Sequence, residues 1–158
     1  MHKVLGFFIA IVLAAILPAS AFSQGTASTL DEIYDAQKNT TNLHYDSHFG
    51  TQVEYLSSRG KAYLWFPGNS RIVKGEWIVL SETDNASSPL LMCFNYGENS
   101  YNPVTGQRGG WECQALPDYL DDLKEQTSGD MFGLARRSRV PFVLNTVPTT
   151  LQQLKDSM

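Results

Sequence analysis

The first residues whose types and spacing could do chemistry are His44, Asp46 and His48. Two histidines four positions apart can hold a metal from one face of a helix, with a glutamate after the first histidine as the base. Tyr45 stands in that place here, and the neighbouring residues are typical of an extended segment or a turn. No further pair of cysteines or histidines completes a ligand set. We therefore expect solvated or hydrogen-bonded histidines, with no metal and no other cofactor.

The sequence contains no motif that is diagnostic of catalysis. It lacks the G-x-S-x-G elbow of serine hydrolases. The glycines of residues 106–110 precede an expected strand, whereas a phosphate-binding loop would precede a helix. A glycosidase built on paired carboxylates stays open on spacing alone, yet no two acids stand out from the others. We expect no catalytic residues, and a binding role is favoured over an enzyme.

Two cysteines, Cys93 and Cys113, are the only ones in the chain. In an oxidising compartment such a pair is expected to form a disulfide. Closing a loop of this size stabilises a fold by roughly 3 kcal/mol in the chain-entropy model. The alternative is two free thiols, one of them a nucleophile, but no histidine-containing motif accompanies either cysteine.

The segment between the cysteines is the best candidate for a binding site. Residues 97–110 are polar and rich in turn residues, and aromatic side chains flank amides and an arginine. Such groups are enriched at recognition surfaces. The predicted binding residues are Tyr96, Tyr101, Asn102, Arg108 and Trp111. The alternative is that the glycines set turns and the aromatic rings complete the core.

The N-terminus has the pattern of a secretory signal peptide. Lys3 precedes an uncharged apolar run over residues 4–17, and Pro18 and a small-x-small site follow. The run is shorter than the roughly 20 residues that a membrane-spanning helix needs. We expect a signal peptide over residues 1–21, cleaved after Ala21 or Ser23, no transmembrane span in the remaining chain, and a periplasmic or secreted protein.

Composition limits the class of partner. The 158 residues carry 12 Lys and Arg against 16 Asp and Glu, a net charge of −4. Phosphate neutralisation requires clustered basic residues, so we expect no nucleic acid as a partner. The one basic cluster, residues 136–139, could contact an acidic partner or lipid headgroups, or be a turn that faces water.

Apolar periodicity predicts a mainly β fold. Thr29 can cap a helix over residues 30–38. Alternation and turn signals predict strands over 51–56, 61–66, 71–80, 90–96 and 111–115. We also expect a helix that begins at Leu116 or Pro117 and ends at about 126, one or two strands within 129–144, and a short helix or frayed tail from 149.

Short turns join these strands, which favours a single antiparallel sheet or small barrel with flanking short helices, in the α+β sense. The predicted β-rich domain spans residues 51–145 and holds the disulfide. A leader and helix over 22–50 precede it, and a tail over 146–158 follows.

Several stretches resemble small exported proteins of alphaproteobacteria with no assigned activity. They are residues 63–69, 75–77, 93–97 and 101–106, and the likeness spans about residues 51–144. It implies a periplasmic setting and offers no catalytic residue to transfer. A looser likeness, by analogy only, is to periplasmic lysozyme inhibitors, which are also compact β domains with a disulfide. The hypothesis is a non-catalytic binding or envelope-associated module that contacts an unknown protein or envelope component. The alternative is a small envelope hydrolase or an inhibitor of a lytic enzyme.

Overall fold

The protein is mainly β in the computed structural model, which describes residues 29–83, 88–103 and 105–158. The strands are β1 (Thr40–Asp46), β2 (Gly50–Leu56), β3 (Lys61–Trp65), β4 (Val73–Ser81), β5 (Leu90–Asn95), β6 (Glu112–Ala115) and β7 (Leu123–Ser128). The helices are α1 (Leu30–Gln37), α2 (Leu116–Asp122) and α3 (Leu151–Asp156), with a 3-10 turn, η1 (Leu134–Arg136).

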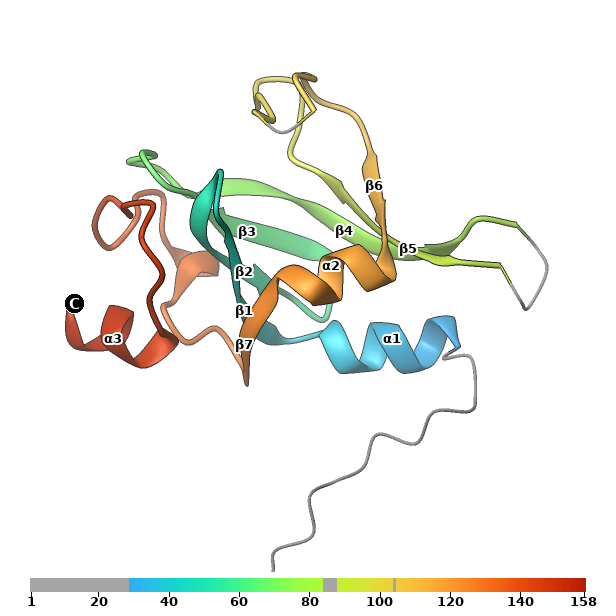
Figure 1. Cartoon of the computed structure of the whole chain (residues 1–158), viewed down its shortest axis with the longest axis horizontal. Helices are drawn as coiled ribbons and strands as arrows, with labels where there is room; N and C mark the ends of the chain where they lie inside the picture. The colour runs from blue at the N-terminus through green and yellow to red at the C-terminus, as the bar shows by residue number, and fades with distance from the viewer. Residues whose placement is uncertain (1–28, 84–87, 104) are drawn as a thin grey trace, which may run out of the picture.

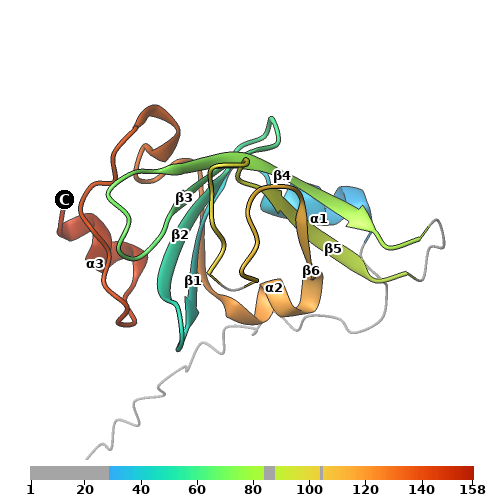
Figure 2. The same ribbon diagram turned by 90° about the horizontal axis from the view of Figure 1, so that it is seen from above.

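The strands form one antiparallel sheet in the order β6-β5-β4-β3-β2-β1-β7. The first six follow one another as a meander, and β7 returns to pair with β1. The sheet curls into a half-barrel, and α2 connects the two edge strands β6 and β7 across its open side (Figures 1 and 2). The predicted antiparallel sheet with short flanking helices is confirmed.

Two hydrophobic clusters cover the two faces of the sheet. On the face that we call inner, α1 and α2 pack on β2 to β5, and the cluster comprises Leu56, Ala62, Trp77, Met92, Leu116 and Tyr119. On the outer face, the chain after β7 packs on β1 to β3, and the cluster includes Leu43, Val53, Trp65, Phe132, Leu134, Leu144, Leu151 and Leu154. Trp65 and Trp77 are fully buried, one in each cluster. The sheet is therefore held by apolar burial on both faces.

The structure differs from the sequence prediction in three segments. Strand β1 was not predicted, because Thr40–Asp46 reads as a polar stretch after the first helix. The expected helix over 117–126 ends at Asp122, and the chain continues as β7 because it pairs with β1. The strands expected within 129–144 are wrong, since this segment forms turns, η1 and an isolated bridge between Arg71 and Arg139.

The expected signal peptide lies in residues 1–28, outside the described part of the chain. Among the residues that the structure describes, no helix is both long and apolar enough to cross a membrane.

Candidate functional site

The connection between β5 and β6 folds back on itself as a small hairpin-like loop. An isolated antiparallel bridge pairs Tyr101 with Arg108, and the Asn102 backbone N–H donates to the Gln107 carbonyl at 3.0 Å. Gly109 lies at φ 62° beside the facing chain, where a Cβ would come within 2.6 Å of the Cα of Glu98. Backbone pairing and close approach thus give the loop a defined shape.

Disulfide bonding anchors both ends of this loop. Cys93 in β5 and Cys113 in β6 are direct cross-strand partners, and their sulfurs are bonded. The expected pairing of these two cysteines is therefore present. Asn102 Nδ2 and Thr105 Oγ1 both donate to the carboxylate of Glu112, at 2.8 and 2.6 Å. The loop is tied to the strand that carries it by covalent and polar contacts.

Three of the five predicted binding residues present side chains to solvent from this loop. The ring of Tyr101 is 55% exposed, and the Arg108 guanidinium carbon lies 5.4 Å from its centroid. Trp111 is 45% exposed at the entrance to β6. Asn102 acts instead as an internal tie to Glu112. An exposed cation over an aromatic ring can contact a polar or anionic partner, and the exposed tryptophan adds a second aromatic surface on the same connection.

Tyr96 does not join this surface but turns toward the inner face of the sheet. Its hydroxyl donates a hydrogen bond to Oε1 of Glu54, a residue that is 5% exposed. Burial raises the pKa of Glu54 from 4.5 to about 7, although the Tyr96 hydrogen bond acts in the opposite direction. A protonatable carboxyl group therefore lies beneath Tyr96, the residue that precedes the loop.

A separate polar network lies on the same inner face, around Asn42, the cross-strand partner of Glu54. Asn42 Nδ2 donates to the Tyr119 hydroxyl at 2.8 Å and to Gln37 Oε1 at 3.1 Å. Gln126 Nε2 donates to Asn42 Oδ1 at 3.0 Å. The contacts join α1, β1, α2 and β7, so they satisfy buried polar groups where these elements meet.

His44 lies at the edge of the same network. Its ring packs against Tyr119 with centroids 4.7 Å apart, and its Nε2 is buried with no hydrogen-bond partner among the described residues. Burial, with a smaller contribution from Lys124, lowers the pKa of His44 to about 4. His48 lies in the exposed β1–β2 turn, whose backbone is capped by Asp46. Within the described ranges, no group of three or more His, Cys, Asp or Glu is arranged to hold a metal.

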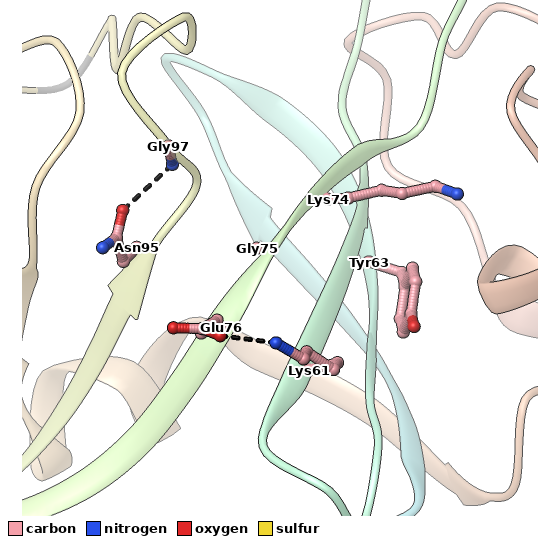
Figure 3. A pocket seen from close by; sticks show the side chains of 7 residues that line it. All are labelled: Lys61, Tyr63, Lys74, Gly75, Glu76, Asn95 and Gly97. Atoms are coloured by element: carbon pink, nitrogen blue, oxygen red, sulfur yellow. Dashed lines mark hydrogen bonds and ion pairs between the residues drawn. The ribbon is translucent and has the colours of Figure 1, made fainter.

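A shallow groove of about 420 Å³ lies where β3, β4 and the end of β5 meet (Figure 3). Lys61 Nζ and Glu76 Oε1 form an ion pair at 2.5 Å across its floor, and Tyr63 is the cross-strand partner of Lys74. Gly97, the first loop residue, also lines it. The groove is therefore continuous with the base of the loop, and its lysines, carboxylate and amide can offer hydrogen bonds.

Sequence reasoning missed Glu54, Asn42 and this groove. Glu54 lies between Val53 and Tyr55 in the sequence, so in a strand its side chain points to the face opposite to theirs. Nothing local showed that this second face would also be buried. The one available signal was the next predicted strand, over residues 61–66, which is apolar on both faces and therefore suggests a sheet covered on both sides.

Comparison of the chain with protein-family models, with curated proteins and with solved structures gives no match.

Proposed function

We propose that the protein is an exported, non-catalytic binding module that captures an envelope protein or component with the loop of residues 97–111. The observation that carries this proposal is the exposed Arg108–Tyr101 pair on a loop fixed at its base by a disulfide. Tyrosine, tryptophan and arginine dominate binding energies at protein interfaces. Backbone pairing and the disulfide restrain the described residues of this loop, so they lose little conformational entropy on binding, which favours affinity.

The disulfide supports an extracytoplasmic setting, because thiols in the cytosol are kept reduced. Glu54, whose pKa is raised, supports binding over catalysis. Its carboxyl group lies beneath Tyr96 and is fully buried, so a substrate would reach it only if Tyr96 moved. The loop, by contrast, presents its polar and aromatic groups directly to solvent.

A quantitative pull-down from envelope extract, with chemical crosslinking, tests the proposal. Arg108→Ala and Trp111→Ala should each lose a crosslinked species that the unaltered protein captures, while the thermal midpoint barely moves. Arg59→Ala is the matched control, because Arg59 is also an exposed loop arginine but lies in the β2–β3 turn. Equal capture by all three variants, or a loss that follows reduced stability, contradicts the proposal.

Inhibition of a lytic enzyme is a second candidate, favoured by the same projecting cation. Glycoside-cleaving enzymes carry two carboxyl groups in an open cleft. Arg108 stacked on Tyr101 has the charge and shape to complement such a cleft. Peptidoglycan digestion by lysozyme should then slow when the protein is added, and Arg108→Ala should restore it. No change in muropeptide release, with or without lysozyme, removes both the inhibitor and a peptidoglycan hydrolase.

A further inference from the structure

Four exposed arginines from two distant segments lie in two pairs on the outer side of the molecule. We call this set the arginine patch, and it comprises Arg71, Arg136, Arg137 and Arg139. Arg71 and Arg139 are partners in an isolated antiparallel bridge. Hydrogen bonds on both sides of the bridge, from Ile72 N to Ser138 O and from Val140 N to Ser70 O, measure 3.3 Å each. The backbone therefore holds these like charges next to each other.

The other two arginines converge over a glycine. A Cβ on Gly133 would lie 3.8 Å from Nη2 of Arg136 and 3.8 Å from Nε of Arg137. Arg137 Nε also donates to the Phe132 carbonyl at 2.9 Å, which fixes its direction. The two guanidinium groups thus approach one point on the surface. Planar guanidinium groups in such an arrangement suit phosphate oxygens, which they can bind in a bidentate way.

Among the described residues, no arginine of the patch forms an ion pair. Within the described ranges, the ion pairs are Lys38–Asp35 and Lys61–Glu76, and neither involves the patch. Asp130 is the acid nearest in sequence to η1, and its carboxylate accepts from the backbone N–H groups of Leu134 and Ala135. The carboxylate keeps its negative charge at the start of η1, so one acid stands against the four arginines of the patch.

The remaining charge is distributed asymmetrically around the sheet. Helices α1 and α2, which cover the inner face, carry six acids and no basic residue: Asp31, Glu32, Asp35, Asp118, Asp121 and Asp122. The patch flanks the outer cluster, to which Phe132 and Leu134 belong. The outer side also carries Glu125, Asp130 and Asp156, but the four arginines and Lys155 outnumber these acids. A chain of net charge −4 therefore has an excess of positive charge on its outer side and of negative charge on its helical side. Such a dipole orients a protein on an extended anionic surface.

We propose that the arginine patch docks the protein on an anionic phospholipid surface. A membrane fits better than a small anion because apolar side chains accompany the charges. Val143 and Val147 follow the patch in the same segment and are each 54% exposed. Basic residues with neighbouring exposed aliphatic groups are typical of surfaces that contact the headgroup region. The loop of residues 97–111 projects from the β5–β6 edge of the sheet, away from the segment that carries the patch (Figure 1).

Vesicle co-sedimentation tests this proposal with matched charge variants. Vesicles of phosphatidylcholine mixed with phosphatidylglycerol are compared with vesicles of phosphatidylcholine alone. The test variant is Arg71→Gln/Arg139→Gln. The control, Arg59→Gln/Lys38→Gln, makes the same change in net charge beside α1, where the Tyr34 hydroxyl bonds the β2–β3 turn. Each basic residue at such a surface contributes about 1 kcal/mol, or about five-fold in affinity.

The unaltered protein should bind the anionic vesicles, dissociate from them as the salt concentration rises, and show no binding to neutral vesicles. The test variant should bind them about 25-fold more weakly, from two such contributions, and the control should retain affinity. The proposal is overturned if the unaltered protein does not bind anionic vesicles, or if both variants weaken equally. It is also overturned if inorganic phosphate competes at low concentration, or if polyglutamate binds where vesicles do not. Far-ultraviolet circular dichroism of both variants excludes unfolding as the cause.

Discussion

Glu54 and His44 should act on stability in opposite directions over the same range of pH. Burial raises the pKa of Glu54 from 4.5 to about 7 and lowers that of His44 from 6.5 to about 4. The folded protein thus binds a proton at Glu54 more tightly than the unfolded chain, and at His44 less tightly. The stability from Glu54 is complete below pH 4.5 and lost as pH rises through 7. The stability from His44 is present above pH 6.5 and lost as pH falls through 4.

Each shift of about 2.5 units is worth roughly 3 kcal/mol, since one unit corresponds to about 1.4 kcal/mol. Both side chains are buried, so solvent screens neither strongly. The two contributions nearly cancel in the unaltered protein, because one rises as the other falls. Substituting one residue should therefore reveal the other. Glu54→Gln retains an acceptor for the Tyr96 hydroxyl but cannot ionise, and His44→Phe retains a ring against Tyr119.

Urea denaturation, followed by the fluorescence of the buried tryptophans, measures the free energy of unfolding of each variant from pH 4 to 8 at constant ionic strength. Glu54→Gln should match the unaltered protein near pH 4 and exceed its stability by roughly 3 kcal/mol at pH 8. The stability of His44→Phe should increase relative to that of the unaltered protein as the pH falls from 6.5 to 4. Subtracting the stability of one variant from that of another cancels the contribution of the surface carboxylates, because all the proteins share these groups.

The double variant Glu54→Gln/His44→Phe is the control for independence. Its difference from the unaltered protein should equal the sum of the two single differences, because neither residue contributes to the pKa shift of the other. Parallel stability curves for the unaltered protein and Glu54→Gln would refute the reasoning. They would mean that the carboxyl group is hydrated in the folded protein or keeps its ordinary pKa.

Three further changes test the anchoring of the loop and the inner network. Replacing Cys93 and Cys113 by serine should lower the free energy of unfolding by about 3 kcal/mol, and unchanged denaturation would contradict the role of the disulfide. Gly109→Ala should lower the free energy of unfolding by about 1–3 kcal/mol more than Gly106→Ala does. Both glycines have positive φ, but only Gly109 faces a backbone contact. Equal melting temperatures of the two variants would contradict this expectation. Asn42→Ala should lower the free energy of unfolding by at least about 2 kcal/mol in urea denaturation, because three polar partners each lose one hydrogen bond, and an unchanged value would show that water replaces the amide.

Strands β2 to β6 could be predicted because apolar side chains, in alternation or in continuous short runs, lie between recognisable turns. Strand β1 could not, since Leu43 is the one aliphatic residue in Thr40–Asp46. Its stability comes from two neighbouring strands and from polar side chains that find partners only in the folded structure. Strand β7 reads Leu-Lys-Glu-Gln, a pattern that favours helix, but pairing with β1 overrides that local preference.

The candidate site was predictable to the level of the loop but not of its individual residues. Turn residues between two cysteines identified residues 97–110 as a projecting segment. The distinction between Tyr101, which faces solvent, and Tyr96, which faces Glu54, depends on the direction of the chain at the end of β5. That direction is set by contacts with β2, which lies far away in the sequence. The same limit hid Arg71, whose proximity to Arg139 arises only from the bridge between them.

Tyr96 connects the buried acid to the proposed binding loop. Separate variants can therefore distinguish the effect of the acid on partner capture from that of the loop surface. Its hydroxyl binds Glu54, and its backbone leads directly into Gly97 and the loop. An ionised carboxylate is a stronger acceptor than a protonated one, so raising the pH through 7 strengthens this hold on Tyr96 while it weakens the fold. Loss of partner capture in Arg108→Ala therefore reports on the loop surface. If partner capture changes with pH, and this change disappears in Glu54→Gln, the change reports on the position of the loop. Each variant leaves the side chain that the other one replaces unaltered.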